Sequence, residues 1–324
     1  MKTDRTYIER EKRWLLALAC LTAFALCLFP SAPTPQAAGI QQKGFSSPDE
    51  AVKLLVEAIR GNDTKKMIAI LGPGSRELIS SGDDASDRAG REKFLTAYDQ
   101  MHSFQKDSAN RMVLCIGSDN WPLPIPIVKK GRQWIFDTIE GRQEILNRRI
   151  GRNELHVMEL LHAYVEAQHK YACSNYSGSG LVEFAGRIVS SDGKRDGLYW
   201  NAEAGEKESP LGPLVAQAAK EGYANPELSP FHGYYFRILT GQGKDAKGGA
   251  YSYLVKGKML LGFALVAYPA EYGNSGIMTF IVNQEGAIYQ KDLGKKTKNR
   301  AEAMTIFNPD RSWKKAKETT GEKQ

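Results

Sequence analysis

Four side chains that bind metals or transfer protons in other proteins recur along one stretch of the chain. Their spacing places all of them on one face of a helix: Glu159, His162, Glu166 and His169. A metal site needs ligands that converge on one point and partners that orient them. The sequence holds no matching cluster elsewhere. We therefore expect the polar face of an amphipathic helix, with no metal ion and no cofactor.

Motifs for nucleophilic catalysis are weak. The sequence has no Gly-x-Ser-x-Gly elbow, and Ser275 lies in a Gly-Asn-Ser-Gly stretch that is typical of a turn. His232 precedes a predicted strand and is a candidate general base if a carboxylate lies beside it; a structural histidine is the alternative that we favour. Asp137 ends a predicted strand, where we expect it to cap or turn the chain. No catalytic residue is predicted.

A glycine-rich loop at 240–249 invites comparison with phosphate-binding loops. Such a loop ends in Gly-Lys followed by Ser or Thr, and opens a helix after a strand. Here strands are predicted on both sides, and no Ser or Thr follows the lysine. We expect a long hairpin loop.

Four aromatic residues stand beside predicted loops, where aromatic side chains are effective anchors for ligands. With His232 they are the candidate ligand-binding residues, and core packing is the alternative explanation for them. They are Trp121, Tyr199, Trp200 and Tyr272.

The composition favours a globular, exported protein. The 324 residues carry a formal charge of +7, and 42% are hydrophobic and 25% charged, which excludes a disordered or collagen-like chain. This length favours two domains. The first 13 positions hold five basic residues, an uncharged run follows over 14–29, and small residues lead to Ala38. This order is typical of a secretory signal peptide. A membrane-spanning helix is less expected, because the apolar run is shorter than the ~20 residues of a membrane span.

We expect cleavage near Ala37 or Ala38. An uncleaved anchor is the alternative, and a lipoprotein attached at Cys20 or Cys27 is a weaker one. Loss of residues 1–38 removes five basic and three acidic residues and lowers the charge to +5. Export argues against a nucleic-acid partner and places the protein in the periplasm or outside the cell, with membrane contact only through an uncleaved leader.

Hydrophobic periodicity predicts an α+β fold. The N-terminal helices (48–60, 65–71 and 85–104) should lie over a curved, cone-like antiparallel sheet built from 111–117, 123–129 and 133–138. A long helix over 142–172 should pack on a C-terminal antiparallel meander, with the stripe Leu155, Met158, Leu161 and Val165 facing the sheet. A short helix is expected at 214–221. The meander strands are 234–239, 250–255, 262–268, 276–283 and 287–290.

These elements divide the chain into a signal peptide (1–38), a cone-like domain (45–140), a helix-plus-sheet domain (141–310) and a basic tail (311–324). We expect a solvated tail; attraction to an anionic surface is the alternative. Cys115 and Cys173 remain after cleavage, and we expect two buried free thiols, with a disulfide as the alternative.

Several stretches carry a resemblance to a known family. They include Gly-Tyr-Tyr-Phe-Arg-Ile-Leu-Thr-Gly-Gln-Gly at 233–243, Phe-Ala-Leu-Val-Ala-Tyr-Pro-Ala at 263–270 and Met-Thr-Phe-Ile-Val-Asn at 278–283, with further matches at 119–126, 147–154 and 194–200. Over about residues 45–315 the chain resembles the exported bacterial domain-of-unknown-function 2950 family. That family has no established activity, so the resemblance implies no catalytic residue.

A second, weaker resemblance concerns the long helix. Residues 154–172, ending in Ala-Gln-His-Lys-Tyr-Ala, resemble the globular-side helix of type IV pilin-like proteins, and the later strands are similar to their sheet. Pilins carry a hydrophobic helix and a prepilin cleavage site directly before this region, whereas here Arg148, Arg149 and Arg152 precede it. The resemblance thus implies a pilin-head-like domain without filament polymerisation. The first domain is similar in outline to the nuclear-transport-factor-2-like cone.

These observations predict a binding or assembly module of the cell envelope, without catalysis, whose partner is an envelope protein or surface. The alternative is an envelope hydrolase with a site between the two domains. A pocket that holds His232 beside a carboxylate favours the hydrolase.

Overall fold

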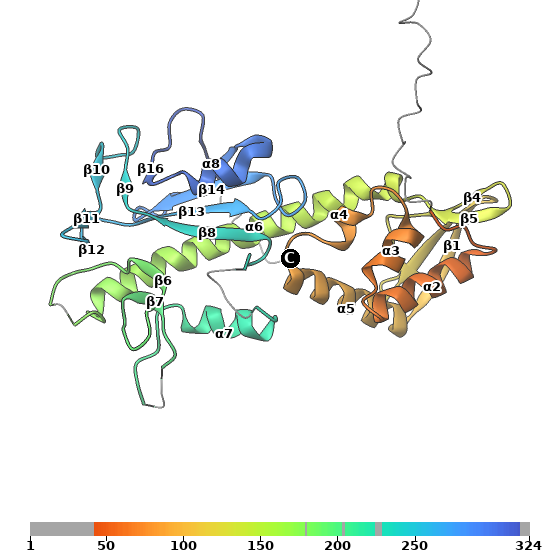
Figure 1. The fold of residues 1–324 in the computed structure, drawn as a ribbon, viewed down its shortest axis with the longest axis horizontal. Coiled ribbons are helices and arrows are strands. Elements are labelled where there is room, and N and C mark those ends of the chain that lie inside the picture. The colour runs from red at the N-terminus through yellow and green to blue at the C-terminus, as the bar shows by residue number, and fades with distance from the viewer. Residues whose placement is uncertain (1–41, 179, 203–204, 224–228, 318–324) are drawn as a thin grey trace, which may run out of the picture. The chain divides into compact units, whose positions relative to one another are not determined.

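The computed structural model describes residues 42–178, 180–202, 205–223 and 229–317, so the predicted signal peptide lies outside the described residues. The first of them form four helices (Figure 1): α2 (Pro48–Arg60), α3 (Thr64–Leu71), α4 (Arg76–Ile79) and α5 (Asp84–Gln100). Ser47 caps α2, as predicted, by accepting a hydrogen bond from the backbone of Glu50. The predicted helix 85–104 ends early, because the chain after Gln100 is extended and pairs in a sheet.

The first sheet is antiparallel. Its order is β1-β2-β4-β5, and β3 pairs with β2. The Pro-rich segment 123–126 stays outside the strands, because proline has no amide to donate to a ladder. The strands are β1 (His102–Ser108), β2 (Arg111–Ile116), β3 (Trp121–Pro122), β4 (Ile127–Lys130) and β5 (Gln133–Phe136).

The long helix α6 (Thr138–Cys173) has 36 residues and no break at the predicted domain boundary. The predicted apolar stripe is partly wrong: Leu161 is fully buried, but Leu155 is 46% exposed. The buried face of α6 is rotated relative to the predicted stripe, and it includes two polar side chains. Asn153 donates to the backbone oxygen of Ser275, and Gln168 donates to that of Ala185. A hydrophobic pattern does not identify such residues.

A second antiparallel sheet follows, with the order β17-β15-β14-β13-β8. The expectation of a solvated tail from residue 311 is wrong for residues 314–315, because these form β17, which pairs with β15. Its strands are β8 (Tyr234–Leu239), β13 (Ala264–Pro269), β14 (Met278–Asn283), β15 (Tyr289–Asp292) and β17 (Lys314–Lys315). Smaller elements surround it: β6 (Arg187–Val189), β7 (Gly197–Tyr199), α7 (Gly212–Lys220), β9 (Gly241–Gln242), β10 (Tyr251–Ser252), β11 (Leu254–Val255), β12 (Lys258–Met259), η1 (Gly294–Lys296), α8 (Thr297–Glu302) and β16 (Ile306–Phe307).

Two hydrophobic clusters form the core. One joins α2 and α3 to the first sheet, and the other joins the second half of α6 to the second sheet and its surroundings. The predicted α+β fold class is confirmed: N-terminal helices with an antiparallel sheet, then the long helix and a C-terminal antiparallel sheet. All described residues belong to one compact unit, so the independent folding of the two regions stays a prediction.

Candidate functional site

Tyr199 and Trp200 line a cleft of about 450 Å³. Both were predicted as ligand-binding residues. Tyr199 is half-buried, whereas Trp200 is only 8% exposed, which agrees with the alternative of core packing for Trp200. The remaining lining residues come from the end of β6, from the loop between β6 and β7, and from beyond β7: Val189, Ser190, Ser191, Asp192, Gly193, Lys194, Arg195, Asn201 and Glu206.

The loop of this cleft is held by its own hydrogen bonds. The backbone N–H and the hydroxyl of Ser191 donate to the two carboxylate oxygens of Asp196, at 2.8 and 2.9 Å. Burial raises the pKa of Asp196, but the hydrogen bonds from Ser191 outweigh it and hold the pKa below its usual value. Gly197 is required because a Cβ there lies 2.6 Å from the backbone of Val189 and Ser190. The absence of a side chain at Gly197 therefore allows the loop after β6 to pass close to β7, which pairs with β6 in parallel.

The indole of Trp200 contacts two other side chains. The guanidinium carbon of Arg195 lies 5.6 Å from the ring centroid, and the ring of Tyr176 meets it edge-on at 4.9 Å. Its Nε1 is buried and has no hydrogen-bond partner among the described residues. Packing explains why this tryptophan is buried.

His232 lies in a different cluster. Its Nε2 is 3.3 Å from a carboxylate oxygen of Glu221, and its ring centroid is 4.6 Å from that of His156. Burial, with a smaller contribution from His156, lowers the pKa of His232, and Glu221 only partly opposes this. The residue adopts φ +49°, a left-handed conformation that is uncommon for residues other than glycine. The carboxylate sought beside His232 is thus present.

The same cluster connects the segment around Tyr223 and Gly233 to the start of α5. Asp83 is 1% exposed and caps α5 through the backbone N–H of Ser86. Its other oxygen accepts hydrogen bonds from the Tyr223 hydroxyl at 3.0 Å and the Gly233 N–H at 2.7 Å. Burial and the neighbouring Asp83 raise the pKa of Tyr223. These bonds satisfy the carboxylate of Asp83, which indicates a structural role.

The other two predicted aromatic residues lie elsewhere. Trp121 is 39% exposed, with the guanidinium of Arg148 5.6 Å from its ring centroid. Tyr272 is half-buried and donates a hydrogen bond to Asp292 at 3.2 Å. Burial, followed by this hydrogen bond, raises the pKa of Tyr272. Neither residue lines the Tyr199 cleft, so the five predicted residues form no single site.

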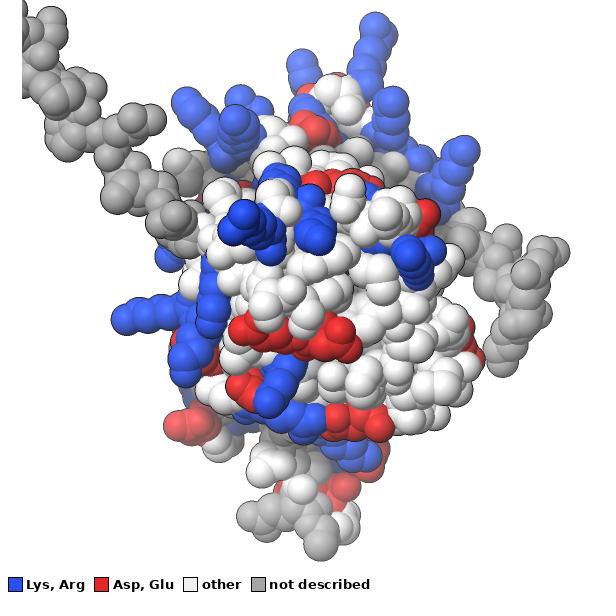
Figure 2. Space-filling model, turned by 90° about the vertical axis from the view of Figure 1, so that its right-hand side faces the viewer, with Lys and Arg blue, Asp and Glu red and all other residues white. Residues whose placement is uncertain are grey.

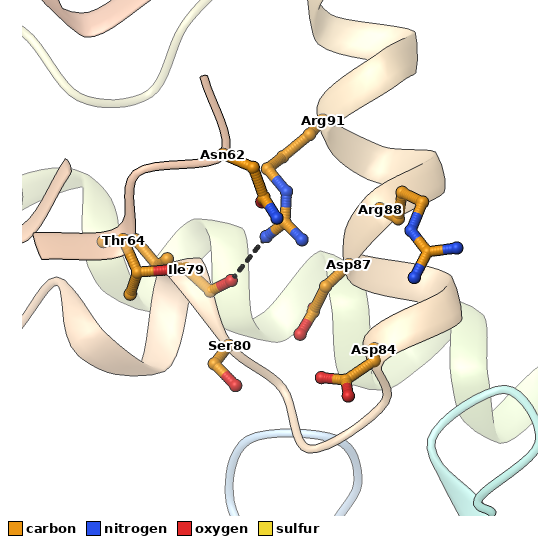
Figure 3. Close-up of a pocket in the computed structure, with 8 residues that line it drawn as sticks. All are labelled: Asn62, Thr64, Ile79, Ser80, Asp84, Asp87, Arg88 and Arg91. Carbon is orange, nitrogen blue, oxygen red and sulfur yellow. Dashed lines mark hydrogen bonds between the residues drawn. The ribbon is translucent and has the colours of Figure 1, made fainter. Parts of the chain in front are cut away.

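A second, smaller cleft of about 250 Å³ lies at the start of α5 (Figure 3). Asp84, Asp87, Arg88 and Arg91 come from α5 and mix both charges. One guanidinium nitrogen of Arg91 donates to the backbone oxygen of Ile79 at 3.2 Å. Burial raises the pKa of Asp87, although Ser81 donates hydrogen bonds to its carboxylate. This cleft has no aromatic lining.

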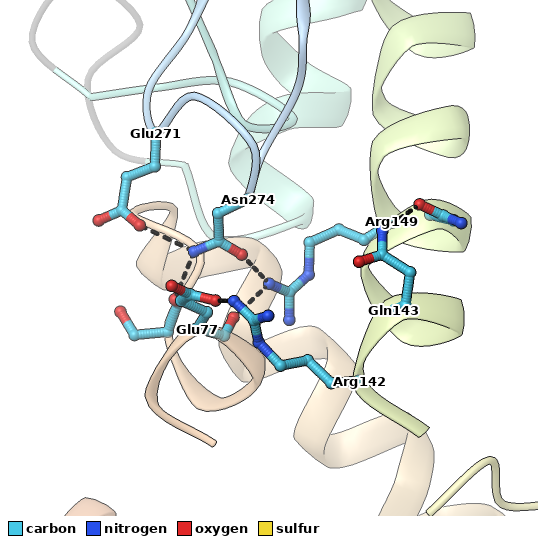
Figure 4. A network of polar contacts seen from close by, with 8 residues as sticks. Glu77, Arg142, Gln143, Arg149, Glu271 and Asn274 are labelled. Carbon is cyan, nitrogen blue, oxygen red and sulfur yellow. Dashed lines mark hydrogen bonds and ion pairs between the residues drawn. The ribbon is translucent and has the colours of Figure 1, made fainter. Parts of the chain in front are cut away.

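Arg149, for which no role was predicted, is the centre of a polar network (Figure 4). Its guanidinium donates to the backbone oxygens of Glu77 and Leu78 in α4, at 2.6 and 2.8 Å, and to the side chain of Asn274 at 2.5 Å. Asn274 in turn donates to the backbone oxygen of Ser80 at 2.9 Å. Burial lowers the pKa of Arg149. In the sequence, the signal that could have indicated this role is the position of Arg149 beside the buried face of α6.

Other sequence predictions concern metals and thiols. The four side chains first considered as metal ligands are exposed, as expected of a polar face: Glu159, His162, Glu166 and His169. Among the described residues, no group of three or more potential ligands is placed to hold a metal ion. Ser275 lies in a turn, where its hydroxyl bonds the backbone of Glu271. Cys115 is a buried free thiol, but Cys173 is exposed because the last residue of α6 lies off the buried face. Within the described segments, no helix has the length and apolar character to cross a membrane.

Comparison with known proteins identifies the family. The family model DUF2950, described as a protein of unknown function, matches residues 42–316. The chain belongs to the DUF2950 family. This match covers the helices, both sheets and the Tyr199 cleft. The chain matches no curated protein and no solved structure.

Proposed function

We propose that this DUF2950 protein is an exported binding module of the cell envelope, without catalysis, and that the cleft lined by Tyr199 is its binding site. The observation that carries the proposal is the cleft itself. Its volume of about 450 Å³ is within the range of ligand sites, about 300–1,000 Å³. It combines an accessible aromatic side chain with polar groups, which orient a ligand.

The lining residues support binding over catalysis. They include neither histidine nor cysteine, and the Ser191 hydroxyl is engaged by Asp196. Acidic side chains interrupt the basic ones on the face drawn in Figure 2, which does not favour a nucleic-acid partner.

An assembly role is supported by the helix-on-meander arrangement of α6 and the second sheet. Glu154 of α6 accepts hydrogen bonds from the backbone N–H groups of Ile277 and Met278, at 3.0 and 2.9 Å. This arrangement is consistent with the proposed pilin-head-like domain. We further propose that the leader is cleaved near Ala38, leaving the protein in the periplasm or outside the cell.

Envelope fractionation tests the proposal. The full chain, expressed with a C-terminal tag in a bacterium, should be recovered with the isolated envelope and have an N-terminus near Gly39. Tyr199→Ala should release it from the envelope, whereas Tyr272→Ala, at a tyrosine outside the cleft, should not. Recovery of the wild-type chain in the cytoplasm, or in the medium without envelope retention, contradicts the proposal.

The hydrolase remains the second candidate, because His232 lies 3.3 Å from Glu221, although His232 lines neither the Tyr199 cleft nor the cleft at the start of α5. Such a pair activates a water or a nucleophile. Hydrolysis of isolated envelope material by the wild-type protein, lost in both His232→Gln and Glu221→Gln while the two variants keep the wild-type melting temperature, would establish it. No release of soluble products would rule out this candidate.

A further inference from the structure

The charged side chains of the Tyr199 cleft offset one another. Arg195 and Glu206 form an ion pair with 3.0 Å between nitrogen and oxygen, and Asp192 and Lys194 are exposed on the same loop. An anionic ligand meets two carboxylates here, and a cationic ligand meets two cations. Since like charges in an interface are costly, the cleft favours a ligand without net charge.

Three lining side chains keep their polar groups open. Within the described residues, Asp192, Lys194 and Asn201 make no side-chain hydrogen bond or ion pair. A carboxylate accepts, an ammonium donates, and an amide does both. A hydroxyl group of a ligand both donates and accepts, so a polyhydroxylated ligand can pair with all three. A purely apolar ligand strips water from these groups without replacing their hydrogen bonds, which is unfavourable.

Tyr199 supplies the apolar surface. Its ring makes no aromatic or cation contact with other described residues, in contrast to the indole of Trp200. A half-buried tyrosine combines an apolar ring with a hydroxyl that forms hydrogen bonds. The C–H groups of a sugar ring match such a ring, while the sugar's hydroxyls match the open polar groups.

The cleft is also formed before any ligand binds. The hydroxyl of Tyr171 on α6 donates to the backbone oxygen of Arg195, and the hydroxyl of Ser190 accepts from the Gly197 N–H at 3.0 Å. Leu198 in β7 is fully buried. A site held in this way loses little conformational freedom on binding.

We propose that the Tyr199 cleft binds a neutral carbohydrate, a segment of an envelope glycan. This inference rests on the proposed function, because it names the ligand class of the same cleft. Tyr199 stacks on a sugar ring, and Asp192, Lys194 and Asn201 bind its hydroxyls.

Titration calorimetry of the full chain tests the ligand class. The probes are neutral tetrasaccharides (chitotetraose, cellotetraose and maltotetraose) and an anionic one, tetragalacturonate. We expect saturable binding of at least one neutral probe and weaker binding of the anionic probe. Tyr199→Ala should weaken that binding at least about tenfold, as for an interface anchor, while Tyr199→Phe stays within about threefold. Tyr251→Ala, at an exposed tyrosine outside the cleft, should bind like the wild type.

Preference for the anionic probe, absence of binding to every neutral probe, or a Tyr199→Ala variant that binds like the wild type would each overturn the carbohydrate proposal. Envelope retention separates this failure from that of the proposed function. A chain that stays with the envelope but binds no neutral tetrasaccharide keeps its role as a binding module and loses this ligand. A chain that is not retained loses the envelope role, whatever the calorimetry shows.

Discussion

Each hydrophobic cluster is the centre of one region of the molecule: the first region holds the N-terminal helices and the first sheet, and the second holds the second sheet and its surroundings. The elements of the two regions are buried to different degrees. In the first region, α5 has no buried residue and β1 keeps six of its seven residues exposed. In the second, all six residues of β13 and five of the six in β14 are buried. Successive residues of a strand point to opposite faces, so such a run requires cover on both faces of the sheet. α6 packs on β14 and α8 on β13.

The comparison indicates where stability resides. We expect the second region to be the more stable, because its central strands bury both faces, whereas elements at the margin of the first region exchange with water more readily. The first part of α6 packs with the first region and the second part with the second region. Substitutions at different positions of this helix therefore test the two regions separately.

Leu161→Asp should have the largest effect. It places a charge without a partner in the fully buried part of α6, at a cost of about 3–5 kcal/mol. Amides of β13 and β14 should lose hydrogen-exchange protection while those of α2 keep it. Leu155→Asp, at an exposed position of the same helix, should change the free energy of unfolding by less than about 0.5 kcal/mol. If Leu161→Asp melts like the wild type, the assignment of α6 to the second cluster is wrong.

Arg149→Ala should weaken the connection between the regions. It removes the bonds to α4 and Asn274, and hydrogen bonds of a charged group contribute about 1.5–3 kcal/mol. We expect the urea transition to separate into two steps, with Arg149→Lys failing to restore one step because an ammonium lacks the planar fork. Arg148→Ala removes an exposed neighbour and is the control. A single transition of wild-type midpoint in Arg149→Ala argues against this connection.

Two glycines of α6 should respond in opposite directions. A Cβ at Gly141 lies 2.3 Å from the backbone oxygen of Pro124, so Gly141→Ala should destabilise the chain by about 1–3 kcal/mol. Gly151 has open space around it, and Gly151→Ala should stabilise the helix by about 1 kcal/mol. Chemical denaturation measures both. Equal effects would contradict the close approach of α6 to 124–125.

His232→Gln should have the smallest effect, seen in the pH dependence of stability. Burial lowers the pKa of His232 in the folded protein, so the unfolded chain, with a pKa near 6.5, takes up a proton first as the pH falls. The free energy of unfolding therefore decreases between about pH 6.5 and the folded pKa, and His232→Gln should remove this decrease. His162→Gln, at an exposed site, should keep it. An unchanged slope in His232→Gln means that the ring is not desolvated.

Much of the architecture was predictable from local patterns. Ser47 and Gly61 bound α2 as predicted, and β8 covers the predicted residues 234–239, because capping and alternation depend on neighbours in the chain. Of the candidate site, Tyr199 and Trp200 were found through their position beside a loop. Their grouping in a cleft, apart from Trp121 and Tyr272, depends on pairings that the pattern does not encode.

The sequence by itself determined the family, the α+β class and the order of the elements, since each of these follows from local spacing or from motif similarity. Only the tertiary structure decided which polar residues are buried. The buried Asp83 and the half-buried Arg149 each bind backbone groups more than 70 residues away in the chain. Burial of a polar group is favourable only when a partner is present, and partners so distant in sequence are brought together by the fold alone.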